Sequence, residues 1–501
     1  MGSISQFDEV YVISDLHLGG AAGFQIFGSA QELVALIDYV RDRPSAQVAL
    51  VINGDSVDFL AEPGARYFDP NGANDKLDRI AGDGSFKPIF DALTQFLARV
   101  NRRLILTLGN HDIELALPWV RSHLVEILAR DDDAAKGRIT LSFDGAGYAC
   151  SVGGSSILCV HGNEVDTWNV SDYERLRRAG RDYVQGRALE EWTPNAGTKL
   201  VVDVMNGIKR TYPFVDLLKP EVEAVVPVLL ALDPSQLQKL SRVMAVATRL
   251  GWDKVRRMTG FLGAGEETEP GSVAIDRKTE EQATSTAAIE HLLNSTFAQP
   301  SSSYGGSESS ELMNEIEEMF NKRTDPMSLV GAGRHLQTLG AFSAAWDWVM
   351  RRPTHEVLRE ALEKLKKDRS FDVRNADSPY RRIDELMGGG FDYVIAGHTH
   401  QERKLARFKG RGMYFNSGTW AALMNFSEKQ LSSPSEFKSV FDAMQNARTI
   451  QDLEQNPGLV ARKPAVVSVT QESGVVQAKL QRVTLVNGAL SLAEVQGEAG
   501  G

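Results

Sequence analysis

The sequence predicts an α/β protein that carries a large, mainly helical insertion. Three observations support this class. Buried-strand patterns alternate with amphipathic helix patterns up to about position 165, and strand patterns return after position 390. Between these regions, helical spacing of apolar residues dominates. Several strands also end in residues that bind metal ions, at the edge where ligands gather in α/β sheets.

The length of 501 residues corresponds to about three domains at ~150 residues each. Apolar residues make up 42% and charged residues 24%, which is typical of a globular protein. No apolar run reaches the ~18 residues of a membrane span. The first residues, MGSISQFDEV, lack the basic and apolar regions of a secretory signal. We therefore expect a cytoplasmic protein.

Charge and cysteine content limit the kinds of ligand and cross-link that this protein can have. With 55 basic and 66 acidic residues, the net charge is −11, which disfavours generic nucleic-acid binding through phosphates. A phosphate substrate remains compatible, because bound metal ions supply positive charge locally. The two cysteines, Cys150 and Cys159, cannot form a disulfide framework, and we expect buried free thiols.

In the N-terminal part, strands are predicted at residues 9–13, 48–52, 104–108, 148–152 and 156–160, the last two as a hairpin. Helices are predicted at residues 29–41, 86–100 and 118–130 from the 3.6-residue spacing of their apolar side chains. Ser29 and Glu32 stand at the spacing of a capping box.

After residue 168 the alternation of strand and helix patterns gives way to helical patterns. Helical spacing is predicted at residues 200–218, 237–250 and 355–367, and a flexible stretch rich in Ser, Gly, Thr and Glu at 263–310. A short helix then begins at Ser378-Pro379, and strands follow at 391–396, 413–416, 465–470 and 475–485. We therefore expect a core split between residues 1–168 and 376–495, with a helical insert or cap at 169–375.

Five polar motifs stand at or just after predicted strand ends. They are Asp15-Leu16-His17, Gly54-Asp55-Ser56-Val57-Asp58, Gly109-Asn110-His111-Asp112, His161 and Gly397-His398-Thr399-His400. Five of the nine histidines lie in them. Each motif alone is more often structural, but five in series at strand ends predict a metal site.

The chemistry of these side chains suits hard or borderline divalent ions such as Mn, Fe or Zn. Asp15 and His17 are two residues apart, so both point to one side of an extended segment. A carboxylate such as Asp55 can bridge two ions about 3.5–4 Å apart, a pair that activates water and clamps a phosphoryl group. Asn110 adds a neutral ligand that keeps the site positive enough to bind an anion.

This motif set resembles the calcineurin-like metallophosphoesterase superfamily over residues 8–165 and 378–425. The resemblance implies a four-layer αββα sandwich and hydrolysis of a phosphoester by a metal-bound hydroxide. Two divalent ions are implied, with Mn favoured and Fe, Zn or Ni as alternatives. The implied ligands are Asp15, His17 and His400 for the first ion, Asn110, His161 and His398 for the second, and Asp55 as the bridge.

The resemblance also implies roles for residues around the ions. His111 would stabilise charge or protonate the leaving oxygen, and Asp58 would orient His111, with Asp112 as a weaker candidate. Ser14-Asp15-Leu16-His17-Leu18-Gly19 and Asn416-Ser417-Gly418-Thr419-Trp420 resemble the bacterial branch of UDP-2,3-diacylglucosamine diphosphatases. That branch usually has Arg where His111 stands, which indicates a different substrate. Phe59-Leu60 and Asp112 depart from the Ser/Thr protein phosphatase pattern.

The insert bears on substrate choice, since the whole of the segment 162–397 separates His161 from His398. A cap there would shape the pocket. We expect a phosphodiester or pyrophosphate substrate, either small and nucleotide-type or lipid-linked. A DNA or RNA nuclease is the alternative within the enzyme class, but related nucleases carry their DNA-binding cap after the last His motif. An inactive binding or regulatory protein is the alternative outside it, and the intact ligand set disfavours it.

Two features of the insert region allow partners. Arg175, Arg177, Arg178 and Arg181 are expected to form a solvated helix face, and contact with a substrate phosphate or an acidic lipid surface is the alternative. Peripheral membrane contact therefore stays open. Apolar residues such as Phe214 are expected in the insert's own core or in an oligomer contact.

Overall fold

The computed structural model describes residues 4–166, 168–218, 355–356, 358–359, 362–363 and 372–495. The chain divides into two compact units. The first comprises Met1–Pro194, Arg369–Asn425 and Arg448–Gly501, and the second comprises Asn195–Asp368 and Phe426–Ala447. All of the predicted metal ligands lie in the first unit. The division predicted from the sequence, at residues 168 and 376, stays a prediction.

A seven-stranded mixed sheet forms one half of the first unit, in the order β15-β14-β13-β2-β3-β4-β5. Its strands are β2 (Glu9–Ile13), β3 (Val48–Asn53), β4 (Arg102–Thr107), β5 (Ile139–Ser142), β13 (Ala465–Glu472), β14 (Val475–Val486) and β15 (Ala489–Glu494). Strands β2 to β5 pair in parallel, whereas β13 joins β2 and β14 antiparallel. The C-terminal hairpin thus completes a sheet that the N-terminal strands begin.

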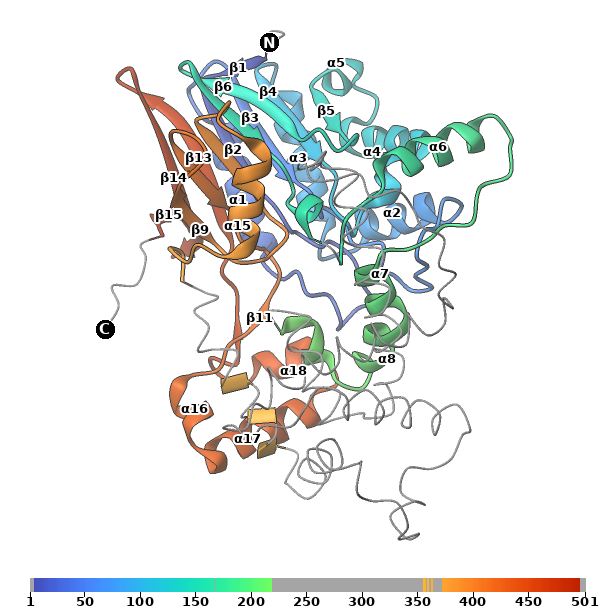
Figure 1. Ribbon diagram of the computed structural model, residues 1–501, viewed down its shortest axis with the longest axis vertical. Helices are drawn as coiled ribbons and strands as arrows, with labels where there is room; N and C mark the ends of the chain where they lie inside the picture. The colour runs from blue at the N-terminus through green and yellow to red at the C-terminus, as the bar shows by residue number, and fades with distance from the viewer. Residues whose placement is uncertain are drawn as a thin grey trace, which may run out of the picture. The chain divides into compact units, whose positions relative to one another are not determined.

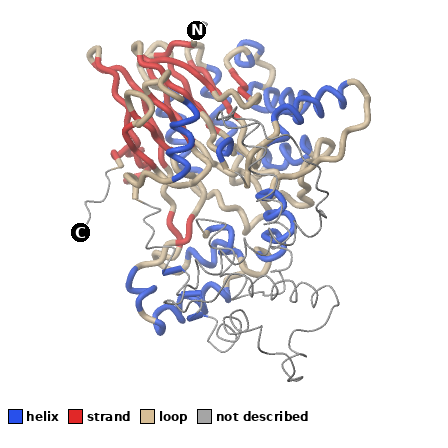
Figure 2. Tube along the Cα trace, viewed as in Figure 1, coloured by secondary structure: helices blue, strands red, loops and turns tan. Residues whose placement is uncertain are grey.

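A six-stranded sheet forms the other half, in the order β1-β6-β7-β8-β10-β9. Its strands are β1 (Ser5–Phe7), β6 (Tyr148–Val152), β7 (Ser155–Cys159), β8 (Tyr393–Ala396), β9 (Arg403–Ala406) and β10 (Met413–Asn416). Strands β7 and β8 pair in parallel, although the entire insert lies between them along the chain. The two sheets are drawn as red strands in Figure 2. A further pair, β11 (Leu423–Met424) and β12 (Val460–Ala461), stands apart from both.

The burial pattern shows how the layers of the first unit are stacked. Tyr11 and Ile13 of β2 pack with the helices that cover the seven-stranded sheet. Val10 and Val12, on the opposite face of the same strand, pack with residues of the six-stranded sheet. Because β2 is apolar on both faces, it must be covered on both.

The outer helices complete four layers. On the seven-stranded sheet lie α1 (Ala30–Arg41), α2 (Ala73–Gly82), α3 (Lys87–Ala98), α4 (Pro118–Ala129) and α5 (Asp133–Lys136). On the six-stranded sheet lies α15 (Ser378–Met387), drawn in orange in Figure 1. Its Tyr380 and Ile383 pack with Val394 of β8. The predicted αββα sandwich is therefore confirmed.

The structure confirms several predictions for individual elements and contradicts one. The structure confirms the strand at Glu9–Ile13 and the helix that begins at Pro118. The capping box at Ser29 is wrong, because the Ser29 side chain makes no capping hydrogen bond at the start of α1. Its backbone ψ of 44° lies outside the extended region that an N-cap usually adopts. Cys150 and Cys159 are buried free thiols, as predicted, and burial raises the pKa of both.

The described chain contains further helices. The first unit also contains η1 (Ile113–Ala116), η2 (Asn163–Val165), α6 (Tyr173–Val184) and α18 (Ile450–Glu454). The second unit contains α7 (Ala196–Leu200), η3 (Val201–Met205), α8 (Asn206–Ile208), η4 (Pro213–Leu217), α16 (Glu428–Ser432) and α17 (Pro434–Asn446). The described residues between 355 and 363 are helical. The predicted helix at 237–250 and the flexible stretch at 263–310 lie outside the described residues.

A fully buried ion pair anchors α15 to the loop after β9. Arg407 Nε lies 2.5 Å from Asp384 Oδ1, and neither side chain is exposed. Asp384 Oδ2 also accepts hydrogen bonds from the backbone N–H groups of Phe408 (2.7 Å) and Lys409 (2.9 Å). Asp384→Ala would leave a buried guanidinium without its counter-charge. We expect a loss of about 3–5 kcal/mol in the free energy of unfolding, measured by urea denaturation.

The matched control is an exposed carboxylate in an ion pair. Asp442 pairs with Lys438 at 2.7 Å, with both side chains about half exposed. Asp442→Ala should change the free energy of unfolding by less than about 1 kcal/mol. Equal losses in the two variants would contradict a stabilising role for the buried pair.

Candidate metal centre

Five of the seven predicted ligands lie two or three residues beyond the end of a strand. Asp15, Asp55 and Asn110 come after β2, β3 and β4 of the seven-stranded sheet, and His161 and His398 come after β7 and β8 of the six-stranded sheet. The described residues include eight non-glycine residues with a left-handed backbone (positive φ). Five of them are Asp15, His17, Asp55, His398 and His400. This conformation is sparsely populated by side-chain-bearing residues and gathers at functional sites.

A first group brings together Asp15, His17 and His400. All three are buried, and their ligand atoms lie within 4.8 Å of one another. Asp15 Oδ1 lies 3.4 Å from His400 Nε2, and His17 Nε2 lies 3.0 Å from the same nitrogen. These are the three residues predicted to hold the first ion.

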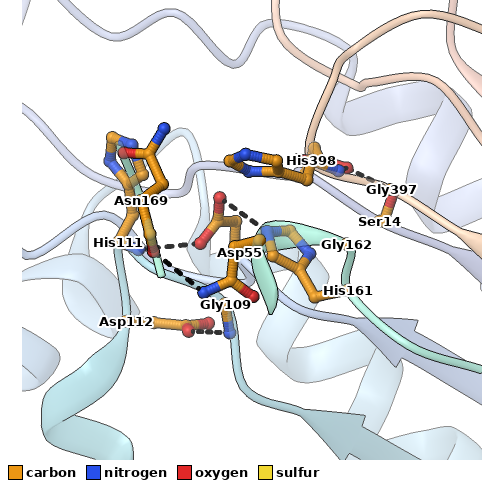
Figure 3. Close-up of polar contacts among 12 residues, drawn as sticks. Ser14, Asp55, Gly109, His111, Asp112, His161, Gly162, Asn169, Gly397 and His398 are labelled. Atoms are coloured by element: carbon orange, nitrogen blue, oxygen red, sulfur yellow. Dashed lines mark hydrogen bonds and ion pairs between the residues drawn. The ribbon is translucent and has the colours of Figure 1, made fainter. Parts of the chain in front are cut away.

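A second group brings together Asp55, His161 and His398 within the same limit. Figure 3 shows the Asp55 carboxylate beside the His161 ring, with His398 above them. Asp55 Oδ2 lies 3.1 Å from His161 Nε2 and 3.8 Å from His17 Nε2. One carboxylate oxygen therefore lies close to a nitrogen of each group.

Two observations test whether this arrangement fits a cation. The Oδ1 atom of Asn110 is buried and has no hydrogen-bond partner among the described residues. His161 Nδ1 lies 2.9 Å from the carbonyl oxygen of Asn53, which only accepts, so Nδ1 carries a proton and Nε2 is the nitrogen that would bind an ion once it is deprotonated. A set of imidazole, carboxylate and amide donors suits divalent transition metals. The residues present fit such an ion.

The predicted partner of His111 is in place. Asp58 Oδ2 lies 3.0 Å from His111 Nδ1, and it also lies 3.2 Å from His17 Nδ1. The backbone N–H of His111 donates to Asp55 Oδ1 at 2.8 Å. His111, His17 and Asp55 together form a third group of candidate ligand atoms. His111 thus stands at the edge of the centre, with its side chain 17% exposed.

The weaker candidate for orienting His111, Asp112, has another position. Its Oδ2 accepts from the backbone N–H (2.8 Å) and the hydroxyl (2.9 Å) of Ser56, and its Oδ1 accepts from the N–H of Gly109 (2.7 Å). Asp112 therefore ties the loop of Asp55 to the loop of Asn110. Burial, together with the charge of Asp55, raises its pKa to about 6.

The carboxylates of the centre are tuned by the imidazoles around them. Burial alone would raise the pKa of Asp15, but the bond from His400 and the nearby histidine charges lower it to about 2. Burial likewise opposes ionisation of Asp55, yet His161 and His111 hold its pKa well below the usual range. Both carboxylates are therefore ionised at neutral pH, the form that binds metal ions.

Two motif glycines allow the loops to approach this closely. A Cβ atom at Gly109 would clash with Asp55 Oδ1 and with the backbone N of Asp55, and one at Gly397 would clash with Asp15 Oδ2. Only glycine fits at these two positions, because a predicted ligand that follows another strand occupies the space of a Cβ atom.

Gly109→Ala is expected to displace the Asp55 carboxylate. We expect Mn²⁺ affinity, measured by isothermal titration, to fall at least about 10-fold, with a stability loss of about 1–3 kcal/mol. The control is Gly82→Ala at the end of α2, where a Cβ atom meets nothing within 4 Å. Unchanged Mn²⁺ affinity in the Gly109 variant would contradict the packing argument.

Sequence reasoning missed several residues that hold the ligands in place. Asp166 Oδ2 lies 2.7 Å from His398 Nε2. Ser14 Oγ contacts Asp15 Oδ2 and lies 2.7 Å from Ser417 Oγ, and Thr419 Oγ1 donates to the carbonyl of Asp15 at 3.0 Å. Ser417 and Thr419 lie in the Asn416–Trp420 motif, which marks a resemblance but does not predict these contacts.

Three of the four arginines in the α6 cluster form ion pairs with the two acidic residues of the same helix. Arg177 Nη2 lies 2.7 Å from Glu174, Arg181 Nε lies 2.9 Å from Asp182, and the Arg175 guanidinium lies 5.3 Å from the ring centre of Trp192. These contacts fit the expected solvated helix face.

Residues 9–220 match the family model described as calcineurin-like phosphoesterase. The match supports a calcineurin-like phosphoesterase domain. It covers under half of the chain and includes Asp15, Asp55, Asn110 and His161, whereas His398 and His400 lie beyond its end. No curated protein matches the chain.

The phosphoesterase domain and the His/Asp groups together fit a metal-dependent phosphoester hydrolase. The family uses divalent metal ions and acts on phosphorylated substrates. In the part of the chain that the structure describes, no helix has the length and apolar character needed to cross a bilayer.

Proposed function

We propose that this protein is a two-metal phosphoesterase that hydrolyses a phosphodiester or pyrophosphate bond. The observation that carries the proposal is the position of Asp55 Oδ2, 3.1 Å from a nitrogen of one ligand group and 3.8 Å from a nitrogen of the other. A carboxylate in that place suits a bridge between two ions. Two divalent ions, when bound, would activate water and neutralise charge on the phosphoryl oxygens.

The ligands divide between the two ions as follows. Asp15, His17 and His400 would hold the first ion, and Asn110, His161 and His398 the second, with Asp55 shared. We propose Mn²⁺ as the ion, because the donor set mixes oxygen and imidazole nitrogen and contains no thiolate.

His111 is proposed to deliver a proton to the leaving oxygen. Asp58 occupies Nδ1 of His111, so Nε2 is the nitrogen that would face the substrate. Asp58 would hold the ring in this tautomer and stabilise the imidazolium form. His111 is partly exposed, which a group that meets an incoming substrate requires.

The substrate class is proposed from the ligand set and the chain order. The rings of His161 and His398 lie 5.4 Å apart between centroids, yet the whole insert separates them in the sequence. The insert is therefore flanked in the sequence by two proposed ligands of the same ion. We propose that it selects the substrate, either small and nucleotide-type or lipid-linked. Replacing residues 195–368 with a short linker should then change the relative rates on different substrates more than it changes Mn²⁺ affinity.

The test is a substrate panel with added Mn²⁺ and a matched series in EDTA. It includes bis-p-nitrophenyl phosphate, nucleoside-diphosphate conjugates, cyclic nucleotides, and single- and double-stranded DNA. We expect hydrolysis of the diester or pyrophosphate members, lost in EDTA and restored by Mn²⁺. Turnover of DNA alone would replace the proposal with a nuclease, and no turnover at any metal concentration would favour an inactive binding protein.

Two further properties complete the proposal. Cytoplasmic location is consistent with the two buried free thiols. Self-association through the helical insert would be tested by light scattering of the intact protein at several concentrations. A concentration-independent monomer mass would contradict it.

A further inference from the structure

Asp166 is a charged residue beside the metal centre to which none of the motifs assigns a role. It lies at the end of η2, in the loop that follows His161. Its Oδ2 atom is 2.7 Å from Nε2 of His398, a predicted ligand from the far side of the insert. The His398 side chain is 11% exposed and that of Asp166 is 29% exposed.

The Asp166 carboxylate is fixed by its own loop before it meets His398. Its Oδ1 accepts from the backbone N–H of Trp168 at 2.8 Å, and its Oδ2 accepts from Nδ2 of Asn169 at 2.7 Å. The Asp166 carbonyl accepts from the N–H of Val170 at 2.9 Å. These local bonds give the acceptor a defined position, independent of any ion.

A carboxylate at Nε2 determines how His398 can bind a metal. Because the carboxylate accepts, Nε2 carries the proton, and Nδ1 is the nitrogen that keeps its lone pair. His161 shows the converse arrangement, since its Nδ1 faces the carbonyl of Asn53 and its Nε2 faces Asp55. Each histidine of the second group is thus oriented by an outer oxygen partner. Such partners set the tautomer and raise the basicity of the ligand.

We propose that Asp166 is a positioning residue for the second metal ion and acts through His398. This inference rests on the proposed two-metal function. The loop after β7 would then supply both a ligand, His161, and the partner of another ligand, His398. Binding of the second ion would then depend on segments before and after the insert, because a single loop holds ligands from both segments.

The test is Mn²⁺ titration of the full-length protein by electron paramagnetic resonance, which separates an isolated ion from a spin-coupled pair. In Asp166→Ala, the coupled-pair signal should require about 10–100-fold more Mn²⁺, while the isolated-ion signal of the first site appears at the wild-type concentration. Asp166→Asn keeps an acceptor oxygen and should lie between wild type and the alanine variant.

Asp172→Ala is the matched control. Asp172 lies in the same loop and caps α6 by accepting from the N–H of Arg175, at 3.0 Å. Its loss destabilises the helix end by about 1 kcal/mol without removing a partner of His398. The coupled-pair signal should therefore be unchanged in this variant.

Three results would overturn the inference. The first is an unchanged pair signal in Asp166→Ala, and the second is an equal weakening of both sites. The third is an Asp166→Asn variant that binds as poorly as the alanine variant. A wild-type protein that forms the coupled pair but hydrolyses nothing on the panel would instead reject the proposed activity and leave the role of Asp166 intact.

Discussion

Asp55→Ala is expected to lower kcat by at least about 10³-fold, equivalent to about 4 kcal/mol of transition-state stabilisation. Asp55 offers Oδ2 to nitrogens of two ligand groups and accepts the N–H of His111 on Oδ1. Its removal would separate the proposed ions and release the loop that carries His111. The measurement is hydrolysis of bis-p-nitrophenyl phosphate at saturating Mn²⁺, with bound metal counted in the same sample.

The control for this variant is another aspartate that contacts a histidine. Asp78 Oδ1 lies 2.7 Å from Nε2 of His123, away from the five motifs, and its side chain is 58% exposed. Asp78→Ala should retain full activity. If Asp55→Ala kept wild-type kcat with a verified metal content, the shared-carboxylate mechanism would be wrong.

His111→Ala is expected to reduce kcat by about 10²–10⁴-fold on substrates with a poor leaving group, the usual range for general acid catalysis. The loss should be much smaller with a p-nitrophenolate leaving group, which departs without a proton. Mn²⁺ affinity should change by less than about 3-fold if His111 is no ligand. The measurement compares an alkyl and a p-nitrophenyl phosphodiester in parallel.

His123→Ala provides the matched histidine control, and its kcat should equal that of the wild type for both substrates. An equal loss on both leaving groups in His111→Ala would assign His111 to charge stabilisation alone. A collapse of Mn²⁺ affinity would instead make His111 a ligand, as its grouping with His17 and Asp55 would allow.

The strand ends and the ligands after them could be predicted because the signal for each lies in a short stretch of sequence. A strand such as Val48–Asn53 is apolar for most of its length, and polar residues follow it. The position of Asp55 just after a strand can therefore be predicted from neighbouring residues alone. The same logic holds for Asn110 after β4 and His398 after β8. Because the ends of parallel strands meet at one edge, these local patterns predicted a shared site.

The failures were contacts between distant segments. Asp166 reaches His398 across the whole insert, and Ser14 reaches Ser417 across most of the chain. No spacing rule relates such positions in a single sequence. The capping box at Ser29 failed for a different reason, since its residue types were right and the backbone conformation before the helix was not.

The left-handed backbone at five predicted ligands bears on whether the chain has kept its metal site or lost it. Each such residue raises the free energy of the folded state by about 1–3 kcal/mol unless its surroundings compensate. A chain released from catalysis could gain stability by accepting glycine at any of the five positions, since glycine adopts this conformation freely. Instead, every one of them holds a carboxylate or an imidazole. The folding stability given up at these positions is therefore an argument that the metal site is retained, independent of the identity of any substrate.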